Sequence, residues 1–379
     1  MGAEERLARR ETPDCGLTIF VMWSLGTALT GNPGWRMQYD RGMSAEPLPG
    51  APATPPMLRV GWLDVGHGHH VYYEQTGAPD GIVALLLHGG PGSSSTSRHR
   101  EILDATRYRI VQFDQRGCGR STPLGETAHN HTDALIEDIE TLRRHLGIER
   151  WLVVGGSWGA ALAVVYAARY RDRVCGVLVR GMFLTSQADL DWFFHGVAAF
   201  APEAHAEFMA VIPQRWRRRV VTYLDRRLAN PCVHDQHAWR VASAWQVYED
   251  KLDRSSSAAS NVSVPDVDAE RRLFARYRVQ AHYLARRCFL GEAAVIRAAS
   301  ALRGVPLALV HGTHDRICRP CNAWRVQRAC AGSRLAWADE AGHTPWHPQT
   351  FRLLREATDG FAAMGDFTQW PVPTTVANR

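Results

Sequence analysis

A serine framed by glycines lies between an apolar run and a run of small residues. Residues 151–154 are apolar, the motif Gly-Gly-Ser-Trp-Gly occupies 155–159, and residues 160–168 suit a helix. A serine in a sharp strand-to-helix turn requires small neighbours, because the strand and the helix approach each other closely. A G-x-S-x-G string alone arises often by chance, but this context is the one that such a turn requires. The sequence therefore predicts that Ser157 is a nucleophile at the end of a buried strand.

Apolar runs and amphipathic segments alternate from residue 58 onward. The short apolar runs read as buried parallel strands, and apolar residues that recur at every third or fourth position indicate helices. Strands are expected at 82–87, 108–113, 151–154, 175–179, 306–310 and 335–338, and helices at 132–146, 160–168, 322–331 and 349–361. We expect Thr132 or Asp133 to cap the first of these helices. With the serine turn, this alternation predicts an α/β-hydrolase fold built on a mostly parallel, doubly wound sheet.

The alternation stops after residue 182 and resumes near residue 300. The intervening segment reads as helical and is rich in Trp, Phe, Tyr and Arg, with a polar break at 255–263. We expect an inserted helical cap subdomain over the carboxyl edge of the sheet, where α/β folds bind their ligands. The predicted division is an N-terminal extension at 1–57, the first part of the core at 58–182, the cap at 183–299 and the second part of the core at 300–379.

The first residues contain an apolar stretch with two interpretations. Residues 16–29 follow two arginines and resemble the core of a signal peptide, but they are too short to span a bilayer comfortably and no clear cleavage site follows. Alternatively, translation starts at Met43, or the leader is an unstructured extension that runs through the Pro- and Ala-rich residues 47–56. We favour this second interpretation, and we therefore expect no membrane association and a cytoplasmic location.

The charge and the cysteine content argue against a nucleic-acid-binding surface and against a metal site. The net charge is +6, yet Lys251 is the only lysine, and the arginine run at 215–219 is typical of a solvated helix face. We expect no nucleic-acid partner. Eight cysteines without regular spacing fit reduced thiols. Cys318 and Cys321 lie close to His311 and His314, but a second tight pair of zinc ligands is missing, so we predict no metal site.

Two residues after later strands complete a catalytic arrangement. A serine hydroxyl is a weak nucleophile at neutral pH, so it requires a histidine base that a carboxylate orients. In the α/β-hydrolase fold the order along the chain is serine, acid, histidine. Asp315 follows the strand expected at 306–310, and His343 follows the strand expected at 335–338. We predict a triad of Ser157, Asp315 and His343, with Asp339 as the alternative acid.

Acyl transfer also requires two backbone N–H groups that bind the developing oxyanion. The residue after the nucleophile, Trp158, supplies one of them. The second comes from the loop after an early strand, where His-Gly-Gly-Pro-Gly occupies 88–92. Within this loop we predict that Gly90 is the donor.

Motifs in constant order along residues 58–362 resemble the proline iminopeptidase family. The matching segments are 88–92, 114–121, 155–159, 180–184, 245–249, 282–283, 311–320 and 341–343. The resemblance implies the same triad, Ser157, Asp315 and His343. It also implies release of N-terminal proline from small peptides through an acyl-enzyme, without metal or cofactor.

The resemblance also implies a substrate pocket, with one departure. Members of the family hold the α-ammonium group with acidic residues of the cap, and Glu249 matches one of them. Arg180, Phe183 and Cys318 match family positions near the substrate, with Phe183 as a wall for the pyrrolidine ring. Where the family usually has a second glutamate, this chain has Gln280. A glutamine accepts a hydrogen bond but brings no charge, so amine binding weakens by ~1–2 kcal/mol.

Three functions follow, in this order. The first is a serine aminopeptidase that releases N-terminal proline from a small peptide or amide substrate. The second is an esterase or amidase of the same fold that has lost amine recognition through Gln280. The third is a non-catalytic ligand-binding protein, which is disfavoured because no triad residue is missing.

Overall fold

The computed structural model describes residues 56–229, 235–253 and 267–370. The predicted N-terminal extension lies almost entirely outside the described residues, as do the apolar stretch at 16–29 and the polar break at 255–263. No helix in the described ranges is long and apolar enough to cross a membrane.

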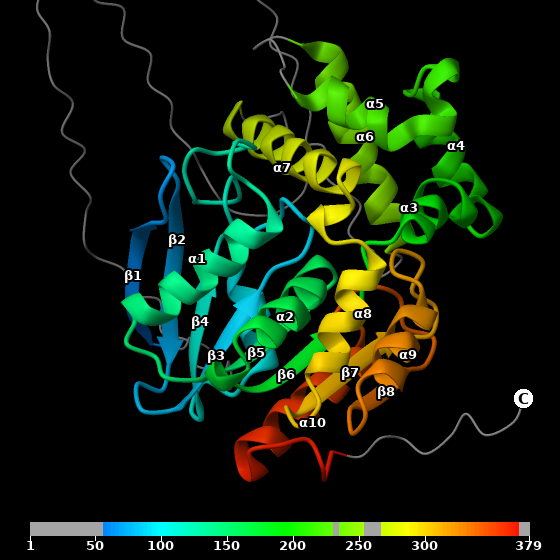
Figure 1. Cartoon of the computed structure of the whole chain (residues 1–379). Coiled ribbons are helices and arrows are strands. Elements are labelled where there is room, and N and C mark those ends of the chain that lie inside the picture. Colours follow the sequence, from blue (N-terminus) through cyan, green and yellow to red (C-terminus); the bar gives the residue numbers. More distant parts are fainter. Residues whose placement is uncertain (1–55, 230–234, 254–266, 371–379) are drawn as a thin grey trace, which may run out of the picture. The chain divides into compact units, whose positions relative to one another are not determined.

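Eight strands form one sheet among the described residues, in the order β1-β2-β4-β3-β5-β6-β7-β8 (Figure 1). Their bounds are β1 (Met57–Asp64), β2 (His70–Gly77), β3 (Ile82–Leu87), β4 (Tyr108–Phe113), β5 (Trp151–Gly156), β6 (Val174–Arg180), β7 (Leu307–Gly312) and β8 (Arg334–Ala338). The pairs from β4 to β8 are parallel, whereas β1 and β2 join the edge as antiparallel strands. The mostly parallel sheet is confirmed.

Helices cover both faces of the sheet because successive strand residues point to opposite sides. In β5, Val153 packs into one apolar cluster and Leu152 into the other. The first face carries α1 (Thr132–His145), α2 (Trp158–Arg169), α8 (Glu292–Ala301) and α9 (Pro320–Ala329), and the second carries η1 (Ser97–Ile102) and α10 (Pro348–Met364) (Figure 1). This is the two-faced α/β arrangement that the alternation predicts.

One helix start differs from the prediction. The N-cap of α1 is His131, whose side chain accepts a hydrogen bond from the backbone N–H of Ala134 at 3.3 Å. The expected cap, Thr132, is already inside the helix, and its hydroxyl donates instead to the backbone carbonyl of Cys288. The threonine hydroxyl is thus used for a tertiary contact rather than for the helix end.

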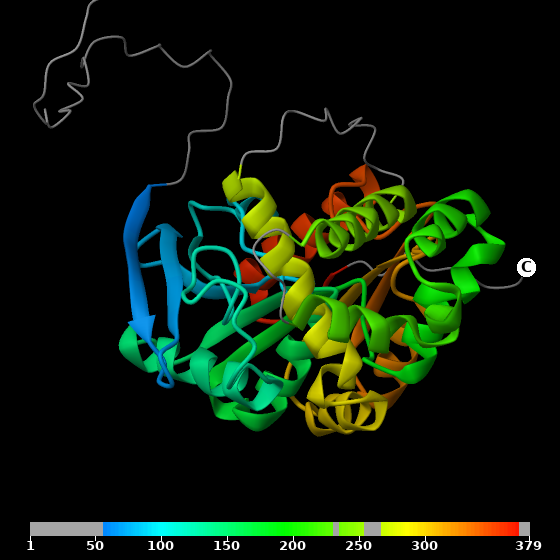
Figure 2. The same cartoon turned by 90° about the horizontal axis from the view of Figure 1, so that it is seen from above.

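The insertion is helical, as expected. It contains α3 (Gln187–Phe194), η3 (Gly196–Ala199), α4 (Pro202–Ala210), η4 (Gln214–Arg219), α5 (Val220–Ala229), α6 (Gln236–Leu252), α7 (Val267–Ala285) and η5 (Arg287–Phe289). A further short helix, η2 (Arg171–Arg173), belongs to the core and precedes β6. Buried aromatic rings join these helices: Trp245 of α6 lies 5.0 Å from Tyr277 of α7 between ring centroids. Seen from above, α7 crosses the sheet (Figure 2). The predicted boundary at residue 299 falls inside α8, and α8 packs on the core helices α2 and α9. The exact division between cap and core stays a prediction.

Candidate active site

Ser157 occupies a strained turn between β5 and α2. Its backbone has φ 58° and ψ −122°, a region that residues with a side chain rarely adopt. Such strain costs about 1–3 kcal/mol and is typical of functional sites. The flanking glycines are required, because a Cβ on Gly155 would lie 2.1 Å from the carbonyl oxygen of Gly159, and one on Gly159 would lie 2.3 Å from that of Leu87. The turn has the backbone geometry and close packing that the sequence predicts for a nucleophile elbow.

Asp315 and His343 form the expected acid–imidazole pair. Nδ1 of His343 lies 2.7 Å from Oδ2 of Asp315. The other carboxylate oxygen accepts the backbone N–H groups of Ile317 and Cys318 at 2.9 and 2.8 Å. Burial opposes ionisation of this carboxyl, but the charge and hydrogen bond of His343, the charge of His311 and the backbone N–H of Cys318 together hold the pKa of Asp315 below its usual value. Asp315 is therefore a carboxylate that fixes the imidazole.

Ser157 and His343 line the same pocket. Among the described residues, Ser157 Oγ forms no hydrogen bond with the imidazole of His343. It lies 4.0 Å from Cys318 Sγ. Catalytic hydrogen bonds are often long without substrate and tighten when substrate binds. Ser157 and His343 therefore meet at one pocket, and the buried Asp315 holds Nδ1 of His343.

The pocket also gathers the residues that the resemblance singled out. It is lined by Gly90, Ser157, Arg180, Phe183, Glu249, Gln280, Cys318 and His343. Of the remaining predicted residues, Asp315 is buried behind His343, and Trp158 turns its side chain into the core, where its indole N–H donates to Gln115 Oε1 at 2.9 Å. Only a backbone contribution of Trp158 to the site fits this placement. The exposed Asp339, the alternative acid, is not among the pocket residues.

Glu249 accepts three hydrogen bonds from side chains of α7. Arg276 Nη2 donates to it at 3.0 Å, the Tyr277 hydroxyl at 2.9 Å and Gln280 Nε2 at 2.5 Å. This contact with a carboxylate fixes the orientation of the Gln280 amide, because only its NH₂ group can donate. Gln280 Oε1 is buried and accepts no hydrogen bond among the described residues. Glu249 thus has Arg276 as its counter-ion, and Oε1 of Gln280 remains as a hydrogen-bond acceptor.

Sequence reasoning missed several residues of the pocket. Arg276 lies one turn before Gln280 on α7, so the spacing of four residues is the signal that places both on one face. Asp250, the neighbour of Glu249 on α6, also lines the pocket. Burial raises the pKa of Asp250. His99 enters from η1, and burial lowers its pKa to about 4, so its imidazole is neutral near pH 7.

Arg180 and Asp253 connect the pocket walls to the loop that carries His343. Arg180 Nη1 donates to the backbone carbonyl of His343. Asp253 Oδ1 accepts the backbone N–H of Thr344 at 3.1 Å, so the end of α6 is attached to the same loop. The loop that carries His343 is therefore hydrogen-bonded both to β6 of the core and to α6 of the cap.

Comparison with known proteins agrees with this geometry. A family model described as alpha/beta hydrolase fold matches residues 83–346. A probable proline iminopeptidase of Leptolyngbya boryana is 34% identical over 314 residues, which are 82% of this chain and 96% of the relative. The proline iminopeptidase of Xanthomonas citri is 37% identical over 306 residues, with 80% and 96% covered.

Solved structures show the same fold. The crystal structure of the esterase RhEst1 from Rhodococcus sp. ECU1013 is similar with a TM-score of 0.55 at 17% identity, over 81% of this chain and 99% of that chain. At this identity the likeness concerns the fold alone. The full-length similarity to curated relatives is more specific. The chain belongs to the proline iminopeptidase family of α/β hydrolases.

Proposed function

We propose that this chain is a serine aminopeptidase that releases N-terminal proline from small peptides. The observation that carries the proposal is that Ser157 and His343 line one pocket together with Glu249 and Gln280 of the cap. A nucleophile and its base in one pocket with carboxylates of the cap fit a substrate whose N-terminal residue carries both the scissile carbonyl and a free amine.

Each step of the proposed reaction is carried out by a residue of this chain. Ser157 Oγ attacks the carbonyl of the N-terminal residue while His343 accepts the hydroxyl proton. The buried Asp315 stabilises the imidazolium, and the backbone N–H groups of Gly90 and Trp158 bind the oxyanion. His343 then protonates the departing amine, which leaves a prolyl ester on Ser157. Water, activated by His343, hydrolyses this ester, so the cycle requires no metal or cofactor.

The cap supplies the amine subsite. A protonated N-terminal amine is attracted by the carboxylates of Glu249 and Asp250 and donates a hydrogen bond to Gln280 Oε1. Arg276 neutralises part of the charge on Glu249, so this subsite binds an ammonium less strongly than two unpaired carboxylates would. Phe183 and Cys318 form the less polar side of the pocket, where the pyrrolidine ring fits. The insertion at 183–299 acts as the cap that selects short substrates with a free N-terminus.

A second candidate is an esterase or amidase of the same fold. The observation that favours it is the set of donors on Glu249, because a carboxylate that already pairs with Arg276 and bonds Tyr277 and Gln280 attracts a substrate amine less. The two candidates differ in one property. An aminopeptidase requires the free amine, whereas the alternative enzyme accepts N-acylated substrates or esters equally well.

Glu249→Gln is the variant that tests amine recognition. With L-proline arylamide, we expect KM to rise about 5- to 30-fold, because one charge-assisted contact of about 1–2 kcal/mol is lost. With the N-acetylated arylamide, the residual rate should not change. Glu207→Gln is the matched control: Glu207 also lies on the cap but pairs with the exposed Lys251, outside the pocket. A KM for the free amine that stays at the wild-type value would favour the esterase or amidase.

Gln280→Glu tests the departure from the family pattern. The new carboxylate would lie within hydrogen-bond distance of Glu249, so the pKa of one of the two is raised and the pair holds a proton at low pH. As the pH rises through this pKa, the added charge appears and strengthens ammonium binding. We expect KM for L-proline arylamide to fall about 5- to 30-fold relative to wild type, with a gain that increases with pH. A ratio of KM values that is flat near one across pH would contradict this role of Gln280.

The cytoplasm is the proposed location of the enzyme. Free thiols at six described cysteines support it: Cys118, Cys175, Cys288, Cys318, Cys321 and Cys330. Oxidising compartments favour paired cysteines.

A further inference from the structure

Gln115 connects the two segments that carry the oxyanion donors. It follows β4, is 2% exposed and does not line the pocket. Its amide nitrogen donates to the backbone carbonyl of His88 at 2.9 Å. Its amide oxygen accepts the indole N–H of Trp158 at 2.9 Å. One side chain therefore joins the loop that contains Gly90 to the first residue of α2.

His88 makes the loop side of this connection rigid. The backbone N–H of Gln115 donates to His88 Nε2 at 3.0 Å, so the imidazole proton resides on Nδ1, which donates to the carbonyl of Gly89 at 3.0 Å. Burial lowers the pKa of His88 and keeps this neutral tautomer. Gln115 thus holds His88 through both its backbone and its side chain, two residues before Gly90.

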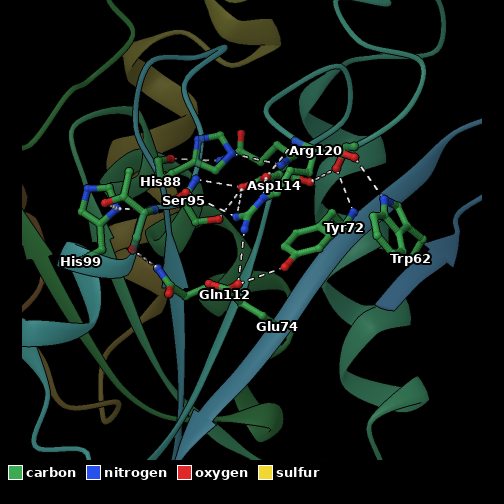
Figure 3. Close-up of polar contacts among 12 residues, drawn as sticks. Trp62, Tyr72, Glu74, His88, Ser95, His99, Gln112, Asp114 and Arg120 are labelled. Carbon is green, nitrogen blue, oxygen red and sulfur yellow. Dashed lines mark hydrogen bonds and ion pairs between the residues drawn. The ribbon is translucent and has the colours of Figure 1, made fainter. Parts of the chain in front are cut away.

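Asp114 fixes the other end of the same loop. Its Oδ1 accepts the backbone N–H of Ser95 at 2.8 Å and also the Ser95 hydroxyl. Its Oδ2 accepts the backbone N–H and Nε of Arg120 at 2.9 and 2.8 Å (Figure 3). The loop at 88–95 is therefore attached at both ends to two consecutive residues that follow a buried strand.

The elbow side is equally constrained. The Trp158 side chain is fully buried, and its ring packs against Tyr283 of α7 with 5.4 Å between centroids. Its indole N–H is satisfied by Gln115 Oε1. Because Trp158 begins α2 directly after Ser157, the position of its ring sets the position of its own backbone N–H.

We propose that Gln115 is a positioning residue that sets the separation between the backbone N–H groups of Gly90 and Trp158. The proposal rests on the proposed acyl-transfer function. Oxyanion donors act at 2.7–3.1 Å from the developing charge, and a displacement of about 1 Å costs about 10²-fold in rate. A side chain that is bonded at both of its ends to the two donor segments fixes this distance before the substrate binds.

Gln115→Leu tests the proposal, because leucine has a similar volume but neither donates nor accepts. We measure kcat and KM with L-proline arylamide and the rate of inactivation by a small fluorophosphonate, whose phosphoryl oxygen occupies the oxyanion site. We expect kcat and the inactivation rate to fall about 10- to 100-fold, with KM within about threefold of wild type. A structural role alone would lower the melting temperature without this split between kcat and KM.

Gln75→Leu is the matched control. Gln75 is also a glutamine that is 2% exposed, but its amide oxygen accepts from Arg109 between β2 and β4, and it does not line the pocket. We expect this variant to have a lower melting temperature than wild type, while its inactivation rate stays within about twofold of the wild-type rate. Trp158→Phe removes the indole N–H together with part of the buried ring. It should lower the inactivation rate about 3- to 10-fold, and adding Gln115→Leu to it should cost less than Gln115→Leu costs alone.

The outcomes separate two failures. If the wild-type enzyme does not react with the fluorophosphonate, the acyl-transfer function is wrong. If it reacts, and Gln115→Leu reacts at the wild-type rate, Gln115 is only structural. Should Gln115→Leu fail to fold, Trp158→Phe decides, because an unchanged inactivation rate in that variant overturns the positioning role.

Discussion

Replacing Ser157 with alanine will lower kcat for L-proline arylamide about 10⁵- to 10⁶-fold. The change removes the one atom that forms the acyl-enzyme, and a triad without its nucleophile retains only the binding and oxyanion contributions. A long arylamide assay, on enzyme whose concentration is determined by absorbance, measures the residual rate. Ser300→Ala, on the exposed face of α8, is the matched control and should keep the wild-type rate.

Cys318 is the one neighbour that could complicate this result. Its Sγ lies 4.0 Å from Ser157 Oγ, but burial raises the pKa of its thiol well above the usual value, so it is protonated and a poor nucleophile. We expect the residual activity of Ser157→Ala to be insensitive to a thiol-alkylating reagent. A residual rate within tenfold of wild type would show that another residue forms the acyl-enzyme.

Asp315→Asn will lower kcat about 10⁴-fold without unfolding the protein. An asparagine amide at this position donates to His343 Nδ1, which moves the imidazole proton to Nε2, where the base must accept the proton of Ser157. The loss should persist through the neutral and alkaline range, because the pKa of Asp315 lies below the usual value of a carboxyl group and the wild-type carboxylate is ionised there. A pH profile of kcat for both enzymes measures this.

Asp339→Asn separates the two acids that the sequence offers. Asp339 lies in the loop before His343, but it is exposed, and His343 makes its carboxylate contact with Asp315. We expect kcat of Asp339→Asn to stay within about twofold of wild type. If this variant lost more activity than Asp315→Asn, the assignment of the orienting acid would be reversed.

Local signals were sufficient to predict the elements that carry the triad. The apolar run at 82–87 and the mostly apolar segment at 108–113 predicted β3 and β4 with their observed bounds, because strands buried on both faces leave few polar positions. The elbow was recognisable for a similar reason, since close packing of β5 on α2 admits only small residues. Asp315 and His343 followed from their positions after β7 and β8.

Contacts that depend on tertiary packing could not be predicted in this way. The ion pair of Arg276 with Glu249 depends on how α7 docks against α6, which neither helix pattern encodes. Gln115 belongs to a matched motif, yet its link between His88 and Trp158 requires three chain segments to meet. The antiparallel β1 and β2 were also not assigned. The edge strand β1 has several exposed positions, and the buried β2 contains the polar residues 74–76, so neither gives a clear apolar pattern.

The rate of arylamine release from L-proline arylamide, compared with its N-acetylated form and with an acyl ester, tests the central proposal most directly. Hydrolysis of the free-amine substrate at least about 100-fold faster than that of the blocked amide is the expected result, because Glu249, Asp250 and Gln280 hold the ammonium group. Rapid cleavage of the ester or the blocked amide, with none of the free prolyl arylamide, would contradict an aminopeptidase.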